Sequence, residues 1–234
     1  MKALLLAAGY GTRLKPITDN IPKCLVKVAN RPLIDYWLEL ILLNKDIDIL
    51  INTHYLSELV EDHVSKSKYA DNITLSFEPK LLGTAGTLMK NLNFINDETL
   101  LLAHADNLTI FSLDDFINAH NKRPHGCLIT MMLFKSDDPS SCGIVKLDKK
   151  GVVTDFYEKV TSPPSNLANG AVYLLDPILL NKMKLIENCF DFSTQVIPHF
   201  INKIYTFLNT NYHRDIGSIK SLEIANRDFK EKKL

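Results

Sequence analysis

The feature that most constrains the fold is the uninterrupted apolar run of residues 3–8, which the segment GYGTR at residues 9–13 follows at once. A short apolar run closed by glycine is typical of a strand buried on both faces, as in a parallel sheet. Two glycines separated by one residue let backbone N–H groups point into a concavity that can hold an anion. The sequence therefore predicts an anion site at the end of a buried strand.

Two cations accompany the glycines. Arg13 has a planar guanidinium suited to phosphate oxygens, and Lys23 follows a proline-containing loop that can fold back toward it. Leu14 stands where the third glycine of the dinucleotide fingerprint would be, and no Gly-Lys-Ser/Thr follows, so neither that fingerprint nor a Walker P-loop is present. A nicotinamide-dependent oxidoreductase is therefore disfavoured, whereas a simple turn with two surface cations remains open.

Helical and strand patterns alternate after this segment. Apolar spacing predicts a helix over residues 33–43, a strand over 47–51, a helix over 57–64 and a strand over 73–77. Such alternation implies βαβ units, hence an α/β fold with a mainly parallel sheet. Ligands of these sheets bind at the carboxyl ends of the strands, where residues 9–13 are expected.

Further elements are expected along the rest of the chain. They are a helix from Thr84 as its cap toward Leu92, strands over 99–105, 127–134, 171–175 and 204–208, helices over 113–120 and 218–229, and a hairpin over 143–159 turning at 148–151. Asp176-Pro177 is expected to begin a helix, and Asp191 to begin another. Asp106 directly follows a buried strand, where an aspartate more often caps the next turn.

Composition excludes several classes of protein. Lys plus Arg and Asp plus Glu both number 27, so a protein-wide basic field for nucleic acid is absent. The four cysteines are scattered without a C-x-x-C pair, which favours free thiols in a reducing compartment over a zinc site. No apolar run approaches a membrane span and no signal peptide is recognisable. We expect a cytoplasmic protein that binds neither nucleic acid nor a membrane.

The segment AAGYGTRLKPITDNIPKCLVKVANRPLI, residues 7–34, resembles the G-x-G-T-R-L and P-K signature of the sugar-1-phosphate nucleotidyltransferases. By motif placement the resemblance extends from residue 4 to about residue 226. It implies a Rossmann-like three-layer sandwich with a mainly parallel central sheet and a small β-hairpin that binds sugar. It also implies one catalytic domain over residues 1–234, without a C-terminal repeat domain. The implied reaction joins a nucleoside triphosphate to a sugar 1-phosphate and releases pyrophosphate, with Mg²⁺ as the cofactor.

The resemblance also implies a set of site residues. Arg13, Lys23 and Asp106 would be catalytic, and Asp106 and Asp215 would hold the metal. The residues implied for the nucleotide are Leu6, Ala8, Gly9, Gly11, Thr12, Arg13, Lys23, Glu78, Gly83 and Thr84. The residues implied for the sugar phosphate are Asn107, Gly143, Glu158, Lys159, Asn169, Gly170 and Asp191.

The segment LLGTAGTL, residues 81–88, resembles guanylyltransferases that act on mannose-type sugars. It implies GTP and a manno-configured hexose or heptose 1-phosphate, the latter as in heptose guanylyltransferases of surface-glycan pathways such as capsule and lipopolysaccharide biosynthesis. The alternatives are uridylyl, cytidylyl or thymidylyl transfer to another sugar or alcohol phosphate, and a regulatory subunit of the same fold without catalysis. Intact Arg13, Lys23, Asp106 and Asp215 argue for an enzyme. A homodimer is possible.

Overall fold

The computed structural model describes residues 1–43, 45–186 and 189–232. The chain divides into two compact units. Unit 1 contains Met1–Lys2, Leu82–Ala103 and Phe111–Asn211, and unit 2 contains Ala3–Leu81, His104–Ile110 and Tyr212–Leu234. Each unit is therefore built from segments that are far apart in the sequence.

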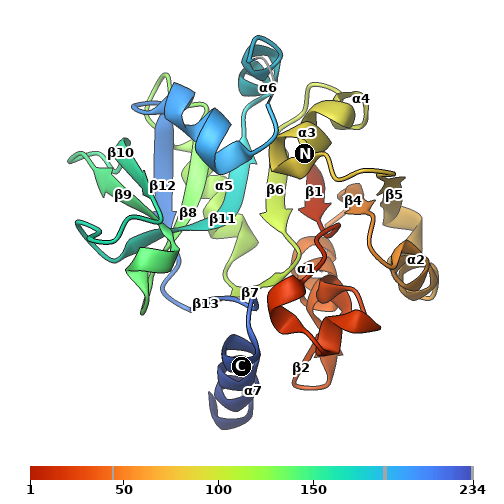
Figure 1. Ribbon diagram of the computed structural model, residues 1–234. Coiled ribbons are helices and arrows are strands. Elements are labelled where there is room, and N and C mark those ends of the chain that lie inside the picture. The colour runs from red at the N-terminus through yellow and green to blue at the C-terminus, as the bar shows by residue number, and fades with distance from the viewer. Residues whose placement is uncertain (44, 187–188, 233–234) are drawn as a thin grey trace. The chain divides into compact units, whose positions relative to one another are not determined.

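Unit 2 contains a parallel sheet. Its strands β1 (Lys2–Leu6), β4 (Ile49–Thr53) and β5 (Ile73–Phe77) lie in that order, with β4 between the other two (Figure 1). The helices α1 (Leu33–Leu42) and α2 (Ser57–Ser65) connect them, so the expected βαβ alternation is confirmed. All five residues of β4 are buried, as a parallel strand covered on both faces should be.

A second part of unit 2 is built from short strands and the C-terminal helix. The strands β7 (Asn107–Ile110) and β13 (Tyr212–Asp215) form an antiparallel ribbon, which leads into α7 (Ile219–Lys232). Short strands β2 (Lys27–Val28) and β3 (Arg31–Pro32) form a small hairpin. A buried apolar cluster packs these elements together, and its members are Leu14, Val26, Val28, Leu33, Leu108, Tyr212, Ile216, Leu222, Ala225 and Phe229. Trp37 of α1 donates a hydrogen bond from Nε1 to the carbonyl oxygen of Asn107, at 2.9 Å.

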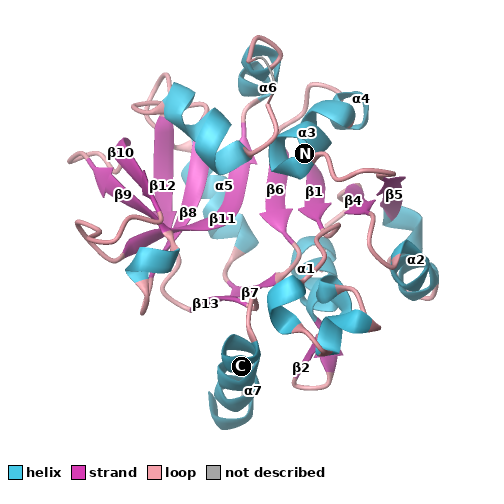
Figure 2. Cartoon of the chain, in the orientation of Figure 1, coloured by secondary structure: helices cyan, strands magenta, loops and turns pink. Residues whose placement is uncertain are grey.

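Unit 1 is built on a mixed sheet (Figure 2). The strand β11 (Leu167–Leu175) pairs antiparallel with β6 (Leu100–His104) and β8 (Ile129–Lys135), and β8 pairs parallel with β12 (Ile204–Leu208). The hairpin of β9 (Gly143–Leu147) and β10 (Val153–Glu158) joins β11 through Ile144 and Ala168. The helices of the unit are α3 (Gly83–Lys90), α4 (Leu92–Ile95), α5 (Leu113–Asn121) and α6 (Pro177–Met183).

Most of the expected elements are confirmed, including the hairpin, whose turn is closed by a hydrogen bond from the Gly151 N–H to the Asp148 carbonyl oxygen at 3.2 Å. Asp176 caps α6 as expected, since its carboxylate accepts the Ile178 N–H at 2.8 Å. The expected cap at Thr84 is wrong, because α3 already begins at Gly83 and Leu82 is its N-cap. The ribbon of β7 and β13 was not expected at all. None of the described helices combines the length and apolar character needed to cross a membrane.

Candidate active site

The loop after β1 has the backbone geometry of an anion cradle. Gly11 is left-handed, with φ of 64°, and a Cβ there would lie 2.9 Å from Cγ2 of Thr18, so only glycine fits. The hydroxyl of Thr18 donates to the Gly11 carbonyl oxygen at 2.8 Å and holds the turn in place. No atom outside the chain neighbours lies within 4 Å of a Cβ built on Gly9, so its backbone faces open space. The backbone at Gly9 therefore leaves room for a phosphate group, and the binding of an anion there stays a prediction.

Lys23 is the centre of a charged cluster in unit 2. Its side chain is almost fully buried, with a relative exposure of 7% for the residue. Its Nζ donates to Oδ2 of Asp106 at 2.7 Å and to Oδ1 of Asp215 at 3.2 Å, while Nη2 of the exposed Arg13 lies 3.5 Å from Oδ2 of Asp215. Two cations and two carboxylates, expected from separate motifs, therefore form one contiguous group.

The cluster fixes the charge of its members. Burial by itself would raise the pKa of Asp106, but the Lys23 ammonium, with help from His104, lowers that pKa below its ordinary value. Burial would likewise lower the pKa of Lys23, and the two carboxylates outweigh it, so that the pKa is raised. Both groups therefore stay ionised at neutral pH.

The ribbon of β7 and β13 explains how the two aspartates meet. Asp106 lies just before β7, and Asp215 ends β13 opposite Asn107 in the antiparallel register. The N–H of Ile216 donates to the Asp106 carbonyl oxygen at 3.3 Å and closes this end of the ribbon. The backbone pairing thus places carboxylates from distant parts of the sequence side by side.

The two carboxylates have the donor chemistry of a divalent cation site. Both reach one ammonium by hydrogen bonds, so an ion in that position could contact both, and phosphate oxygens would supply its other ligands. A Cβ on Gly217 would lie 2.6 Å from Oδ2 of Asp215, so this glycine leaves the space that the carboxylate occupies. Within the described ranges, no group of three or more His, Cys, Asp or Glu side chains has metal-site geometry. The two carboxylates alone would leave most ligand positions of a divalent cation to other donors, such as phosphate oxygens.

A network of polar side chains forms hydrogen bonds to Ala7 and Tyr10, on either side of Gly9. Glu78 has no exposed surface, and its Oε1 accepts a hydrogen bond from Nδ2 of Asn52 at 3.0 Å. Oδ1 of Asn52 accepts the N–H of Ala7 at 2.7 Å. His54 donates from Nδ1 to the Glu78 carbonyl oxygen at 2.7 Å, which leaves Nε2 to accept the Tyr10 hydroxyl at 2.8 Å. Sequence reasoning missed Asn52 and His54, although polar residues after an apolar strand were the available signal.

In unit 1, the hairpin strands β9 and β10 place the residues implied for the sugar phosphate. A Cβ on Gly143 would lie 2.7 Å from Oε2 of Glu158 and 2.5 Å from Cζ of Phe156, so only glycine leaves room for that carboxylate. Nζ of the exposed Lys159 lies 3.6 Å from Oε1 of Glu158. Hydrogen-bond acceptor and cation are therefore adjacent, as a phosphorylated sugar would require.

Asn169 has a fixed amide orientation. Its Nδ2 donates to the Tyr173 hydroxyl at 2.7 Å, and its Oδ1 accepts the N–H of Ala171 at 3.0 Å. The pairing of β11 with β8 shifts register between Asn169 and Tyr173, which bends this part of the strand. Tyr173 is buried against Phe192, with ring centroids 4.9 Å apart, and burial raises its pKa above the ordinary value. No sequence pattern indicated that Tyr173 would contact Asn169.

Thr84 and Asp191, which the resemblance assigns to different substrates, contact each other in unit 1. The Thr84 hydroxyl accepts the Phe192 N–H at 2.7 Å and lies 3.4 Å from Oδ2 of Asp191. Oδ1 of Asp191 accepts the Thr194 N–H at 2.8 Å, which confirms Asp191 as a helix cap. Gly83, with φ of 73°, lies against Phe190 so closely that a side chain there would collide. This segment therefore holds the start of α3 in place.

The other implied residues fall in two groups. Leu6, Ala8 and Asn107 are buried in unit 2, around the loop and the ribbon, whereas Gly170 belongs to β11 of unit 1. Arg13, Lys23, Asp106 and Asp215 form one connected set of ion pairs. The nucleotide and sugar roles of the rest stay predictions.

A model of the family described as nucleotidyl transferase matches residues 2–232. The chain belongs to the nucleotidyl transferase family. This nucleotidyl transferase is 30% identical over 225 residues to the mannose-1-phosphate guanylyltransferase catalytic subunit beta of Danio rerio, and 29% identical over 228 residues to mannose-1-phosphate guanyltransferase 2 of Candida glabrata. Each alignment covers 94% of the chain and 62% of the relative, so the chain spans less than two thirds of their length.

Solved structures confirm the α/β fold class of this nucleotidyl transferase. A putative glucose-1-phosphate thymidylyltransferase from Bacillus anthracis, solved with a sucrose, has a TM-score of 0.86 and 22% identity, covering 99% of this chain and 96% of that one. HddC from Yersinia pseudotuberculosis, complexed with GMP-PN, has a TM-score of 0.79 and 21% identity, covering 97% and 99%. At these identities the likeness is one of fold.

Proposed function

We propose that this nucleotidyl transferase joins GTP to a manno-configured hexose or heptose 1-phosphate and releases pyrophosphate. The observation that carries the proposal is the cluster of Lys23, Asp106, Asp215 and Arg13 beside the glycine loop. The names of the relatives, mannose-1-phosphate guanylyltransferases, support the choice of GTP and of a mannose-type sugar. A place in capsule or lipopolysaccharide biosynthesis and a cytoplasmic location are parts of the same proposal.

The reaction needs no covalent enzyme intermediate, because the sugar phosphate is itself a nucleophile. Its oxygen forms the new bond to the α-phosphorus, the bond from that phosphorus to the bridging oxygen breaks, and pyrophosphate leaves with the electron pair. The protein therefore has to align two anions and offset their charge. Backbone N–H groups of residues 9–13 and the Arg13 guanidinium would hold the triphosphate.

Lys23 would stabilise the charge that develops on the phosphates. Asp106 and Asp215 would hold Mg²⁺, which, when bound, supplies Lewis-acid stabilisation of phosphate oxygens. A cation that contacted both carboxylates would compete with the Lys23 ammonium for them, which would free that ammonium for a phosphate oxygen. In unit 1, Glu158 and Asn169 would accept or donate hydrogen bonds to sugar hydroxyls, and Lys159 would offset the attacking phosphate.

A substrate grid tests the proposal. Pyrophosphate release would be followed with Mg²⁺ while GTP, UTP, CTP, ATP and dTTP are crossed with mannose, glucose, N-acetylglucosamine and manno-heptose 1-phosphates. Release with GTP and a manno-configured sugar phosphate is the expected result. Release with another pair would correct the specificity, and silence across the grid with a folded protein that binds GTP would favour a regulatory subunit instead.

A further inference from the structure

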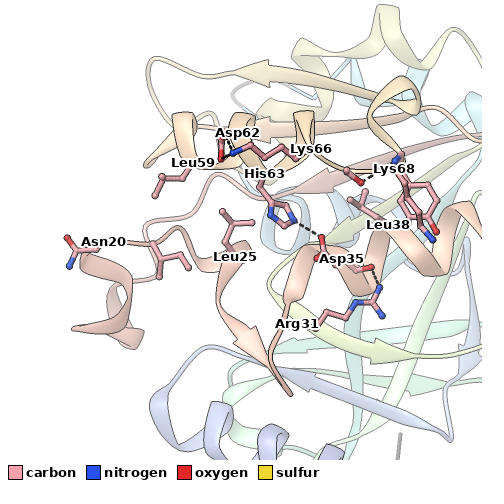
Figure 3. A pocket seen from close by; sticks show the side chains of 13 residues that line it. Asn20, Leu25, Arg31, Asp35, Leu38, Leu59, Asp62, His63, Lys66 and Lys68 are labelled. Atoms are coloured by element: carbon pink, nitrogen blue, oxygen red, sulfur yellow. Dashed lines mark hydrogen bonds and ion pairs between the residues drawn. The ribbon is translucent and has the colours of Figure 1, made fainter.

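Unit 2 contains a cavity of about 560 Å³ that the proposed reaction does not use. Its walls come from α1, α2, the turn after α2 and the segment that precedes and includes Leu25, and Figure 3 shows these side chains around a common space. The volume lies within the range of small-molecule sites, about 300 to 1,000 Å³. Residues 9–13, to which we assign the triphosphate, do not line it.

One part of the cavity wall is apolar. Ile21, Leu25, Leu38 and Leu59 contribute side chains from three different segments. Leu38 and Leu25 are buried, whereas Leu59 on α2 is 41% exposed, so apolar surface is left open beside a buried floor. Such surface stabilises a ligand that has an apolar body.

The rim of the cavity is basic. Its cations are Arg31, Lys66 and Lys68. Arg31 pairs with Glu39, and Lys66 pairs with Asp62 at 2.6 Å in a solvent-exposed ion pair. Lys68 lies over the Tyr69 ring at 4.7 Å and has no carboxylate partner within the described part of the chain. Exposed ion pairs contribute little to stability, so their cations stay available to an anion.

Asp35 also lines the cavity, but its carboxylate already accepts a hydrogen bond and is less able to neutralise the cations of the rim. Its Oδ1 accepts a hydrogen bond from Nε2 of His63 at 2.6 Å, and its carbonyl oxygen accepts one from Arg31 at 2.5 Å. The pair of Asp35 and His63 joins α1 to α2 inside the cavity (Figure 3). The cavity thus combines an apolar floor and three cations with two acids, Asp35 and Asp62, that are both already paired, and this combination matches an amphiphilic anion.

The cavity also touches the segment that carries Lys23. Lys23 and Leu25 belong to one 3₁₀ turn, Lys23–Leu25, which is closed by hydrogen bonds from the Leu25 N–H to the Pro22 carbonyl oxygen at 2.9 Å and from the Val26 N–H to the Lys23 carbonyl oxygen at 3.1 Å. With three residues per turn, side chains two residues apart point in directions about 120° apart. Leu25 therefore faces the cavity while Lys23 reaches Asp106 and Asp215.

We propose that this cavity is a second binding site of the protein, for a small organic anion with one carboxylate or phosphate monoester on an apolar body, and that its occupant steadies the turn that positions Lys23. A ligand packed on Leu25 limits the movement of that turn. The site thus couples an external small molecule to the position of the buried cation, independently of which substrates the protein transforms.

Fluorescence of 8-anilinonaphthalene-1-sulfonate, an aromatic sulfonate, tests binding to the full-length chain. We expect saturable binding of one probe, weakened about fivefold or more by Leu59→Gln and by Lys68→Ala. The matched controls, Leu208→Gln at a leucine of 42% exposure on β12 and Lys149→Ala at an exposed lysine, should bind as the wild type does. Octanoate and phenyl phosphate should displace the probe, whereas uncharged octanol should not. The competitor that displaces the probe at the lower concentration identifies the preferred acidic group, carboxylate or phosphate monoester.

Hydrogen exchange tests the coupling without any turnover. The probe should slow exchange of amides in residues 20–28 by about fivefold, within the range of typical couplings, and leave β5 unchanged. At a probe concentration near the wild-type dissociation constant, this protection should be clearly smaller in Lys68→Ala. Because the Lys68 side chain is exposed, we expect this variant to fold normally, and circular dichroism checks that it does. Equal probe binding in wild type and both cavity variants, or displacement by GTP with Mg²⁺ while those variants bind normally, would overturn the site. Binding without protection of residues 20–28 would overturn the coupling.

Discussion

Lys23 illustrates how one side chain sets the charge of the candidate site. It is buried, bridges two carboxylates, and has no apolar substitute that would keep both acids compensated. Its neighbour in the sequence signature, Arg13, is exposed and pairs with the Asp215 carboxylate. The two cations named by the same motif therefore have different physical roles.

Replacing Lys23 by methionine should lower kcat by about a hundredfold or more, the usual loss when a preorganised charge at the transition state is removed. Lys27→Met, at an exposed lysine four residues on, is the matched control and should keep wild-type rates. Pyrophosphate release under saturating substrates measures both. Wild-type kcat in the Lys23 variant would contradict its assignment.

His120 makes the fold sensitive to acid. It is buried, its Nδ1 lies 2.8 Å from the Thr130 hydroxyl, and burial lowers its pKa to about 4. The unfolded chain, with an ordinary pKa near 6.5, takes up the proton more readily, so stability is full above about pH 6.5 and declines as the pH falls toward 4.

The loss attributable to His120 should be about 1 to 3 kcal/mol between pH 7 and pH 4.5. Urea unfolding at the two pH values measures it. His120→Gln should show a smaller difference between the two conditions, while His125→Gln, at an exposed histidine, should retain the wild-type difference. An identical pH response in wild type and His120→Gln would show that another group is responsible.

Tyr173 acts through Asn169, so its removal should affect one substrate selectively. Tyr173→Phe deletes the hydroxyl that receives the Asn169 amide, and a net hydrogen bond of about 0.5 to 1.5 kcal/mol corresponds to a roughly 2- to 13-fold rise in KM for the sugar phosphate. KM for GTP should stay unchanged. Steady-state kinetics with Tyr205→Phe as the control decides between this role and a general loss of stability, which would affect both substrates.

At the scale of elements, the regular pieces were predictable and their pairing was not. Apolar spacing predicted α1 and α2 closely, and strand composition predicted β5 and β12 to the residue. The ribbon of β7 and β13 escaped prediction because its strands are four residues long and about a hundred residues apart. Short polar strands have little periodicity of their own, and tertiary pairing decides them.

The same limit explains the wrong cap at Thr84. A threonine beside glycine at an expected helix start is a good local signal for capping. In the structure the Thr84 hydroxyl bonds to the backbone of Phe192 instead, more than a hundred residues away. Local sequence cannot show such a partner.

Gly143 tests the hairpin as an element. Gly143→Ala would push a Cβ to 2.7 Å from the Glu158 carboxylate, so KM for the sugar phosphate should rise by about tenfold or more. Gly151, in the turn of the same hairpin, has φ of 77°. Gly151→Ala should therefore cost about 1 kcal/mol of stability and leave the KM for the sugar phosphate unchanged. Kinetics and thermal unfolding of both variants separate the two effects.

At the scale of the whole molecule, the resemblance to a known family predicted more of the candidate site than the residue patterns alone did. Composition and periodicity gave an α/β chain with an anion loop, and the aspartates at 106 and 215 became a pair only through the family. The structure supplies the physical reason for that pair, a shared ammonium and an antiparallel ribbon. The supporting residues Asn52, His54 and Tyr173 needed the folded chain to become visible.

Chelation of divalent cations should stop turnover without loosening the fold. Lys23 pairs with both Asp106 and Asp215, and Arg13 also pairs with Asp215, so the folded state needs no metal to keep these carboxylates paired. Activity should vanish in EDTA and return with excess Mg²⁺, whereas the unfolding temperature in EDTA should stay within about 2 °C of its value with Mg²⁺, less than a 1 kcal/mol change would produce. A large drop in that temperature would mean that the metal is structural.

The interleaved order of the two units has a consequence for biosynthesis. Lys23 and Asp215 are 192 residues apart in the sequence. At about 5 to 20 residues per second, the ribosome therefore adds Lys23 to the chain roughly 10 to 40 seconds before it adds Asp215. Throughout that interval the nascent chain holds a cation whose final partner has yet to be made. Translation speed, and any chaperone bound to the emerging N-terminal half, therefore acts on Lys23 before Asp215 has been made.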